Sequence, residues 1–258
     1  MKNALTTMKK DILTMSYRAK EGHIASAYSI LDILYVLYEK ILFDANGEKL
    51  GEFILSKGHA SLALYAVLRG KGMVTSEEFD SFATYDSILG GHPSRNKVNG
   101  VVASTGSLGH GLPIGVGLAL GKRIQGKGER TYVLVGDGEL NEGSVWEAIE
   151  LAGHHRLDAL TCIVDYNHST DRALDLGRIG DKFAVFGWEA VTIDGHDHAA
   201  LEAALTARSS EGKPRAIIAE TIKGYGCKDM ENNPAWHHRF PTAEEMEQML
   251  AELDERNG

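Results

Sequence analysis

The amino-acid sequence predicts an α/β protein with a mostly parallel sheet that carries helices on both faces. Short apolar runs alternate with helical segments from residue 131 onward, and this alternation is typical of parallel sheets. Runs such as TYVLV at residues 131–135 are continuously apolar, which indicates strands buried on both faces. Ligands of such sheets bind in the loops at the carboxyl ends of the strands.

The first hundred residues are predicted to be mainly helical. Apolar residues recur at helical spacing in residues 4–19 and more strongly in 26–42. The other elements predicted here are a strand at 53–55, a helix at 59–68 and a short helix that begins at Ser76, with loop-like sequence at 89–105. The elements predicted after this loop are strands at 131–135, 160–164, 188–193 and 215–221 and helices at 111–124, 143–155, 198–209 and 243–255.

Composition excludes several classes of protein. The formal net charge of −9 argues against binding of nucleic acid as the main function. The two cysteines, Cys162 and Cys227, are too few for a disulfide framework or a zinc module. No apolar stretch is long enough for a membrane span, and the N-terminus lacks the apolar core of a signal peptide, so a cytoplasmic protein is expected.

The segment VGDGELNEG at residues 135–143 predicts a metal and phosphate site. Asp137 follows one buried strand, flanked by Gly136 and Gly138, and Asn167 follows the next strand 30 positions later. A βαβ unit of this length places both side chains at the same edge of the sheet. A carboxylate and an amide oxygen suit Mg²⁺ when phosphates complete its shell, and the glycines let backbone N–H groups approach those phosphates.

The other glycine-rich segment does not fit a nucleotide site. TGSLGHG at residues 105–111 lacks the Gly-Lys-Ser/Thr ending of a P-loop. Neither glycine cluster follows a strand with the spacing of a dinucleotide fingerprint. Six of the eleven histidines directly follow a glycine, which suggests a site built from several loops.

With these motifs in place, the chain resembles the N-terminal, diphosphate-binding module of the transketolase family. The Gly-Asp-Gly followed by Asn is the thiamine diphosphate signature. Eight blocks match the family in order and span nearly the whole chain. The matching blocks are residues 21–34, 53–68, 90–95, 103–120, 135–148, 163–167, 186–197 and 230–237.

The resemblance implies roles for individual residues. Four histidines would line the channel to the cofactor, handle sugar hydroxyls and transfer protons: His23, His59, His92 and His237. The turn Ser107-Leu108-Gly109 would lie against the aminopyrimidine end of thiamine diphosphate. Asp137, Asn167 and the carbonyl of Ser169 would hold Mg²⁺, and Gly136 would touch the diphosphate. Glu142 matches a glutamate at the interface between cofactor-binding modules.

Residues 1–258 are predicted to form one such module, because nothing after His237 resembles the pyrimidine-binding module of a transketolase. The expected partner is therefore a separate C-terminal, pyrimidine-binding subunit, with a heterotetramer as the assembly. The expected reaction is transfer of a two-carbon ketol unit from a ketose, expected to be phosphorylated, to an aldose.

The chain departs from the family pattern at three places. Ala25 stands where glycine is usual, the loop at residues 168–182 is shorter, and His238 replaces a glycine. Other interpretations also remain open: a deoxyxylulose-phosphate-synthase-like enzyme, the α subunit of a 2-oxoacid dehydrogenase, or a non-catalytic paralogue. The sequence does not assign roles to His110, His168 and His238.

Overall fold

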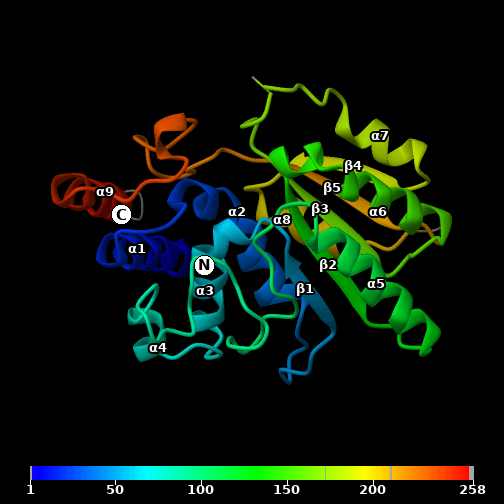
Figure 1. The fold of residues 1–258 in the computed structure, drawn as a ribbon, viewed down its shortest axis with the longest axis horizontal. Coiled ribbons are helices and arrows are strands. Elements are labelled where there is room, and N and C mark those ends of the chain that lie inside the picture. The colour runs from blue at the N-terminus through cyan, green and yellow to red at the C-terminus, as the bar shows by residue number, and fades with distance from the viewer. Residues whose placement is uncertain (1, 172, 210, 256–258) are drawn as a thin grey trace. The chain divides into compact units, whose positions relative to one another are not determined.

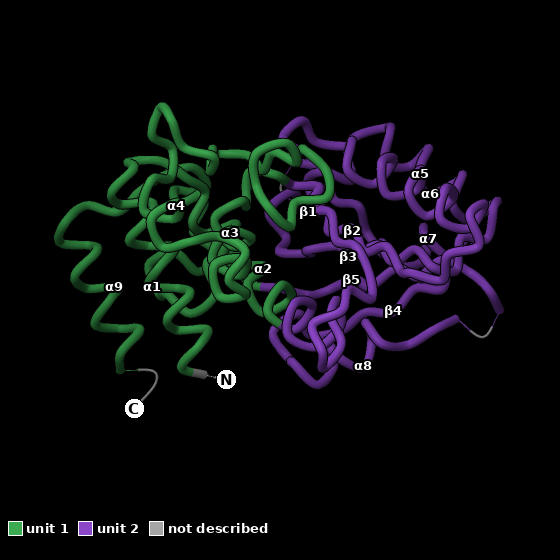
Figure 2. Tube along the Cα trace, turned by 90° about the horizontal axis from the view of Figure 1, so that it is seen from below, with its two compact units in different colours: residues 1–35, 58–104, 222–258 green, residues 36–57, 105–221 purple. Residues whose placement is uncertain are grey.

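The computed structural model describes residues 2–171, 173–209 and 211–255. The chain divides into two compact units, each assembled from separate segments of sequence. Unit 1 comprises residues 1–35, 58–104 and 222–258, and unit 2 comprises residues 36–57 and 105–221 (Figure 2). The prediction of one module over residues 1–258 stays a prediction.

Unit 2 contains a five-stranded, all-parallel sheet in the order β1-β2-β3-β5-β4 (Figure 1). Its strands are β1 Gly51–Leu55, β2 Arg130–Gly136, β3 Leu160–Tyr166, β4 Glu189–Asp194 and β5 Arg215–Glu220. Every residue of β2 is buried, as expected for a strand between neighbours with both faces covered. Strand β4 is half-exposed because it lies at the edge of the sheet.

The helices of unit 2 follow from the strand order. Its helices are α5 Gly111–Ile124, α6 Gly143–His154, α7 Ile179–Val185 and α8 His198–Thr206. The chain moves in one direction across the sheet through α6 and α7, and it returns through α8 from β4 to β5. Right-handed crossovers place the returning helix on the opposite face, and Figure 2 shows α8 on the other side of the sheet from α6 and α7. Helix α5 packs closely on β2, since a Cβ on Gly115 would lie 2.4 Å from Val133.

Unit 1 is helical. Its helices are α1 Lys2–Ala19, α2 Ile24–Val36 (whose last residue belongs to unit 2), α3 Ser61–Gly70, α4 Ser76–Asp80 and α9 Ala243–Glu255. Helix α1 packs against both α3 and α9. The apolar side of α9, with Met246, Met249 and Leu253 buried, agrees with the predicted amphipathic helix.

The structure confirms the predicted fold class and every predicted strand, and it revises several helices. The helix predicted at 26–42 is regular only to Val36 and continues as a π-helical turn at Leu37–Ile41. Thr75 rather than Ser76 caps α4, in a capping box with Glu78. Helix α7 lies partly inside the predicted loop 168–182; it has only seven residues and buries Ile179 and Phe183.

The prediction that no segment spans a membrane agrees with the helices of the described residues, because none of them is both long and apolar enough to cross a bilayer.

Candidate active site

Asp137 lies at the carboxyl edge of the unit 2 sheet, one residue after β2. The residue is 4% exposed. Its carboxylate accepts hydrogen bonds from the backbone N–H of Gly138 at 2.7 Å and, more distantly, of Thr170 at 3.4 Å. Burial and the nearby charge of Asp165 raise the pKa of Asp137. No side-chain cation pairs with Asp137 among the described residues, so this edge presents a buried anion that a bound cation would stabilise.

Asn167 follows β3, and a buried network orients its side chain. Its Nδ2 donates to Asp165 at 2.9 Å, which leaves Oδ1 to act as the acceptor. Asp165 is itself fully buried, pairs with Lys57 near the end of β1 and accepts a hydrogen bond from Thr221. The register places Asp165 opposite Gly136 in the β2–β3 pair, so the two strand ends bring Asp137 and Asn167 to the same edge.

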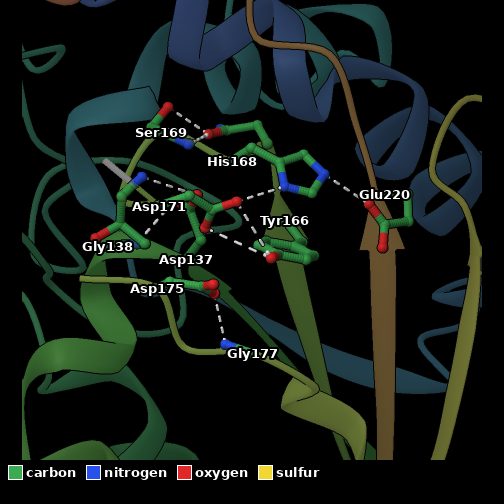
Figure 3. Close-up of polar contacts among 11 residues, drawn as sticks. Asp137, Gly138, Tyr166, His168, Ser169, Asp171, Asp175, Gly177 and Glu220 are labelled. Atoms are coloured by element: carbon green, nitrogen blue, oxygen red, sulfur yellow. Dashed lines mark hydrogen bonds and ion pairs between the residues drawn. The ribbon is translucent and has the colours of Figure 1, made fainter. Parts of the chain in front are cut away.

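The loop after Asn167 folds back over this edge. Ser169 donates from its backbone N–H at 3.2 Å and from its hydroxyl to Asn167 Oδ1. Thr170 donates its N–H to Asp137 and accepts a hydrogen bond from Asn141 at 2.9 Å. The three predicted metal residues, Asp137, Asn167 and Ser169, are therefore connected through one loop (Figure 3).

His168 anchors the same loop from its outer side. Its ring lies 4.1 Å from the Tyr166 ring, and its two nitrogens contact Asp171 at 2.7 Å and Glu220 at 2.9 Å (Figure 3). Burial opposes its charge, but the hydrogen bonds to both carboxylates outweigh burial and raise the pKa of His168. The backbone of His168 is left-handed, with φ of 60°, so the ring contacts help to hold an unfavourable conformation.

The donor set at this edge fits Mg²⁺. It offers one carboxylate, one amide oxygen and a loop backbone, and magnesium keeps such sparse protein ligands when water and phosphate complete its octahedron. Among the described residues, no group of three or more His, Cys, Asp or Glu side chains is arranged as a metal site. A site for a transition metal held by the protein alone is therefore not supported, whereas a metal shared with phosphate agrees with the geometry.

The turn Ser107-Leu108-Gly109 belongs to unit 2 and is held by the segment after β2. Gly109 has φ of 83°, and a Cβ there would lie 2.6 Å from Ser144 Oγ and 2.7 Å from Glu142 Cβ. Only glycine fits this position. The backbone N–H of Gly136 donates to Glu139 at 3.2 Å, so any contact of Gly136 with a diphosphate would use its other atoms. Gly138 opens the turn after Asp137, and Glu142 is exposed and caps no backbone N–H with its side chain.

A cluster of imidazoles forms in unit 1. The ring of His23 lies 4.9 Å from that of His59, 5.5 Å from that of His237 and 4.5 Å from that of His238. Burial, followed by the nearby His238 and His237, lowers the pKa of His23 to about 4, although Glu21 acts in the opposite direction. His92 also acts electrostatically on His23. All four predicted histidines thus gather in unit 1, with His23 neutral near pH 7.

Sequence reasoning missed several residues that hold these sites together. Lys223 is buried and contacts Nδ1 of His237 at 3.0 Å, and His238 contacts Glu21 at 3.1 Å. In unit 2 the missed residues are Lys57, Asp165 and Glu139. The signal available for Lys57 and Asp165 was a charge inside an apolar strand or at its end, because buried charges need partners. His110 contacts the carbonyl of Leu108 at 3.0 Å, which is a local role in the turn.

Comparisons with known proteins agree with this geometry. The model of the family "Transketolase, thiamine diphosphate binding domain" matches residues 2–254. The first of the two subunits that name the apulose-4-phosphate transketolase of Phocaeicola vulgatus is 38% identical, over 96% of this chain and 92% of that protein. The 6-deoxy-6-sulfo-D-fructose transketolase subunit SqwG of Clostridium sp. is 34% identical, over 90% of this chain and 88% of that protein. The crystal structure of transketolase from Campylobacter jejuni superposes with a TM-score of 0.87 at 29% identity, over 98% of this chain and 42% of that one.

These matches confirm the predicted resemblance and the prediction of a transketolase-type transferase subunit, since two relatives of almost the same length are transketolase subunits. They also confirm thiamine diphosphate as the cofactor of the domain, while Mg²⁺ and the individual site residues stay predictions. By its sequence over residues 2–254 and by its fold, the chain belongs to the transketolase family, as a thiamine diphosphate-binding domain.

Proposed function

We propose that the chain is the diphosphate-binding subunit of a two-component transketolase that moves a two-carbon ketol unit from a ketose to an aldose. The observation that carries this proposal is the edge at which buried Asp137 and the oriented amide of Asn167 are linked by the 168–170 loop. Because the names of both transketolase relatives include a sugar with an anionic group, we expect a phosphorylated or otherwise anionic ketose as donor.

In this proposal Asp137, Asn167 and the Ser169 carbonyl hold Mg²⁺, which binds the diphosphate of the cofactor. Gly136 and Gly138 allow the diphosphate to approach the backbone. The turn Ser107-Leu108-Gly109 contacts the aminopyrimidine end. When bound, thiamine diphosphate supplies the stabilisation of the carbanion that forms when the carbon–carbon bond of the ketose breaks.

The histidines of unit 1 would move protons between sugar oxygens. The donor hydroxyl loses a proton as the bond breaks, and the acceptor carbonyl oxygen gains one. His23 is suited to accept a proton at neutral pH, because its lowered pKa keeps the ring uncharged. His59, His92 and His237 are the other candidates for holding sugar hydroxyls.

The partner would be a pyrimidine-binding subunit. Two copies of each chain would form a heterotetramer with the interface near Glu142. Light scattering of the mixed chains tests this stoichiometry. We also propose a cytoplasmic location, with which the two buried free cysteines, Cys162 and Cys227, agree.

Calorimetry and a coupled assay test the function. The chain, mixed with a pyrimidine-binding partner, is titrated with thiamine diphosphate in the presence of Mg²⁺, and ketol transfer between sugar phosphates is then measured. Asp137→Asn should lower activity by about 100-fold or more, because it removes the charge that holds the metal. Asp158→Asn, which makes the same change at an exposed turn, is the control.

Three results would overturn the proposal. Unchanged activity of Asp137→Asn would remove Asp137 from the metal site. Release of CO₂ from a 2-oxoacid without ketol transfer would indicate a 2-oxoacid dehydrogenase. Absence of thiamine diphosphate binding with and without the partner would indicate a non-catalytic paralogue.

A further inference from the structure

Glu139 is a buried carboxylate that neither the metal site nor the histidine cluster uses. It lies in the short 3-10 turn Gly138–Asn141 after β2 and is 1% exposed. Oε1 accepts hydrogen bonds from the hydroxyl of Ser56 and from the backbone N–H of Gly109 at 2.9 Å. Oε2 accepts a hydrogen bond from the backbone N–H of Gly136 at 3.2 Å.

These three donors come from three different loops of unit 2. Ser56 follows β1, Gly109 belongs to the turn before α5, and Gly136 ends β2. All three donors are neutral, and burial raises the pKa of Glu139 against the effect of its hydrogen bonds. A buried carboxylate held by neutral donors costs more than an apolar side chain, so a specific arrangement of its donors is needed to keep it.

The Gly109 turn depends on the segment that carries Glu139. Glu139 holds the N–H of Gly109, and Ser144 donates to the carbonyl of the same residue at 2.8 Å. The left-handed backbone of Gly109 is therefore fixed at both of its polar groups. Loss of the Glu139 contact would leave a buried N–H without its acceptor, and the turn would have to move to find water.

We propose that Glu139 is a positioning residue for the cofactor, whose carboxylate fixes Gly109 and thereby holds the turn Ser107-Leu108-Gly109 against the aminopyrimidine end of thiamine diphosphate. This inference rests on the proposed function. It assigns Glu139 to the end of the cofactor opposite the diphosphate, which Asp137 and Asn167 hold. A role in the core alone would disturb both ends of the cofactor equally.

The test compares the full-length chain with Glu139→Ala, and Glu150→Ala, an exposed glutamate on α6, is the matched control. Hydrogen exchange of residues 105–110 is measured first without ligand. Binding of thiamine diphosphate with Mg²⁺ and of pyrophosphate with Mg²⁺ is then measured by calorimetry. If Glu139→Ala does not fold, Glu139→Asp keeps the charge and shortens the reach by one methylene.

Glu139→Ala should speed exchange of residues 105–110 about ten-fold and weaken thiamine diphosphate about ten-fold, which corresponds to the loss of one buried hydrogen bond with its unpaired partner. Pyrophosphate affinity should change less than about three-fold, since the diphosphate contacts remain. Glu139→Gln should recover most of the thiamine diphosphate affinity, because its amide oxygen can still accept from Gly109.

Unchanged exchange of residues 105–110, or equal loss of affinity for both probes, would overturn the positioning role. If the wild-type chain, alone and with its partner, binds no thiamine diphosphate, the proposed function fails instead. The exchange measurement still decides whether Glu139 holds the turn, because it uses no ligand.

Discussion

The carboxyl edge of the unit 2 sheet and the histidine cluster of unit 1 use opposite electrostatic strategies. At the sheet edge, Asp137, Glu139 and Asp165 bury three carboxylates around one cation, Lys57. In unit 1, His23 lies among imidazoles that discourage its protonation. The first region is prepared for an added cation, and the second is prepared for an added proton. The difference indicates metal binding in one region and proton transfer in the other.

The largest expected effect concerns the cation of the sheet edge. Lys57→Met removes the partner of fully buried Asp165 and should lower the free energy of unfolding by about 3–5 kcal/mol, because a buried charge is left without its counterion. Urea unfolding measures the change in midpoint at constant slope. Lys127→Met, at an exposed turn, should be within about 0.5 kcal/mol of wild type. A loss below about 1 kcal/mol for Lys57→Met would show that the two regions are not electrostatically different.

The second effect is a pH dependence specific to the histidine cluster. Since the pKa of His23 falls from 6.5 to about 4 on folding, the unfolded chain binds more protons between these values. The contribution of His23 to stability is complete above pH 6.5 and is lost as the pH falls toward 4, with a slope of at most about 1.4 kcal/mol per pH unit. His23→Gln should therefore show a shallower loss of stability than wild type between pH 6.5 and 4. Parallel unfolding curves of the two proteins over this range would contradict the lowered pKa.

A third change sharpens the origin of that pKa. His238 is the charged neighbour with the largest effect on His23, after burial. His238→Gly, which restores the residue usual in the family at this position, should raise the pKa of His23 because it removes a like charge and admits water. NMR titration of the His23 ring measures the shift. An unchanged pKa would assign the effect to burial alone.

The smallest expected effect comes from an exposed ion pair that resembles Lys57–Asp165 only in its residue types. Arg178 and Asp181 lie 3.0 Å apart with side chains 87% and 61% exposed. Arg178→Ala should change the free energy of unfolding by less than about 0.5 kcal/mol, since water already solvates both charges. Thermal unfolding measures this change, and a loss above about 1 kcal/mol would mean that ion pairs of this unit matter irrespective of burial.

Much of the candidate site was predictable because it depends on residue order along adjacent strands. Asp137 and Asn167 follow β2 and β3, which pair in parallel register, so their shared edge follows from the spacing of two apolar runs. Glu139 was not predictable as a hub, since its partners Ser56 and Gly109 are 83 and 30 positions away. Helix α7 was missed because its seven residues are too few for a periodic signal.

The sequence by itself determined the parallel sheet, the position of Asp137 and Asn167 and the transketolase resemblance, because these depend on local periodicity and on motifs that are continuous in the chain. Only the tertiary structure decided that Asp165 and Lys57 orient Asn167, that Glu139 holds the Gly109 turn and that His238 joins the histidine cluster. These contacts join residues far apart in sequence, and their strength comes from burial, which no local pattern of residues encodes.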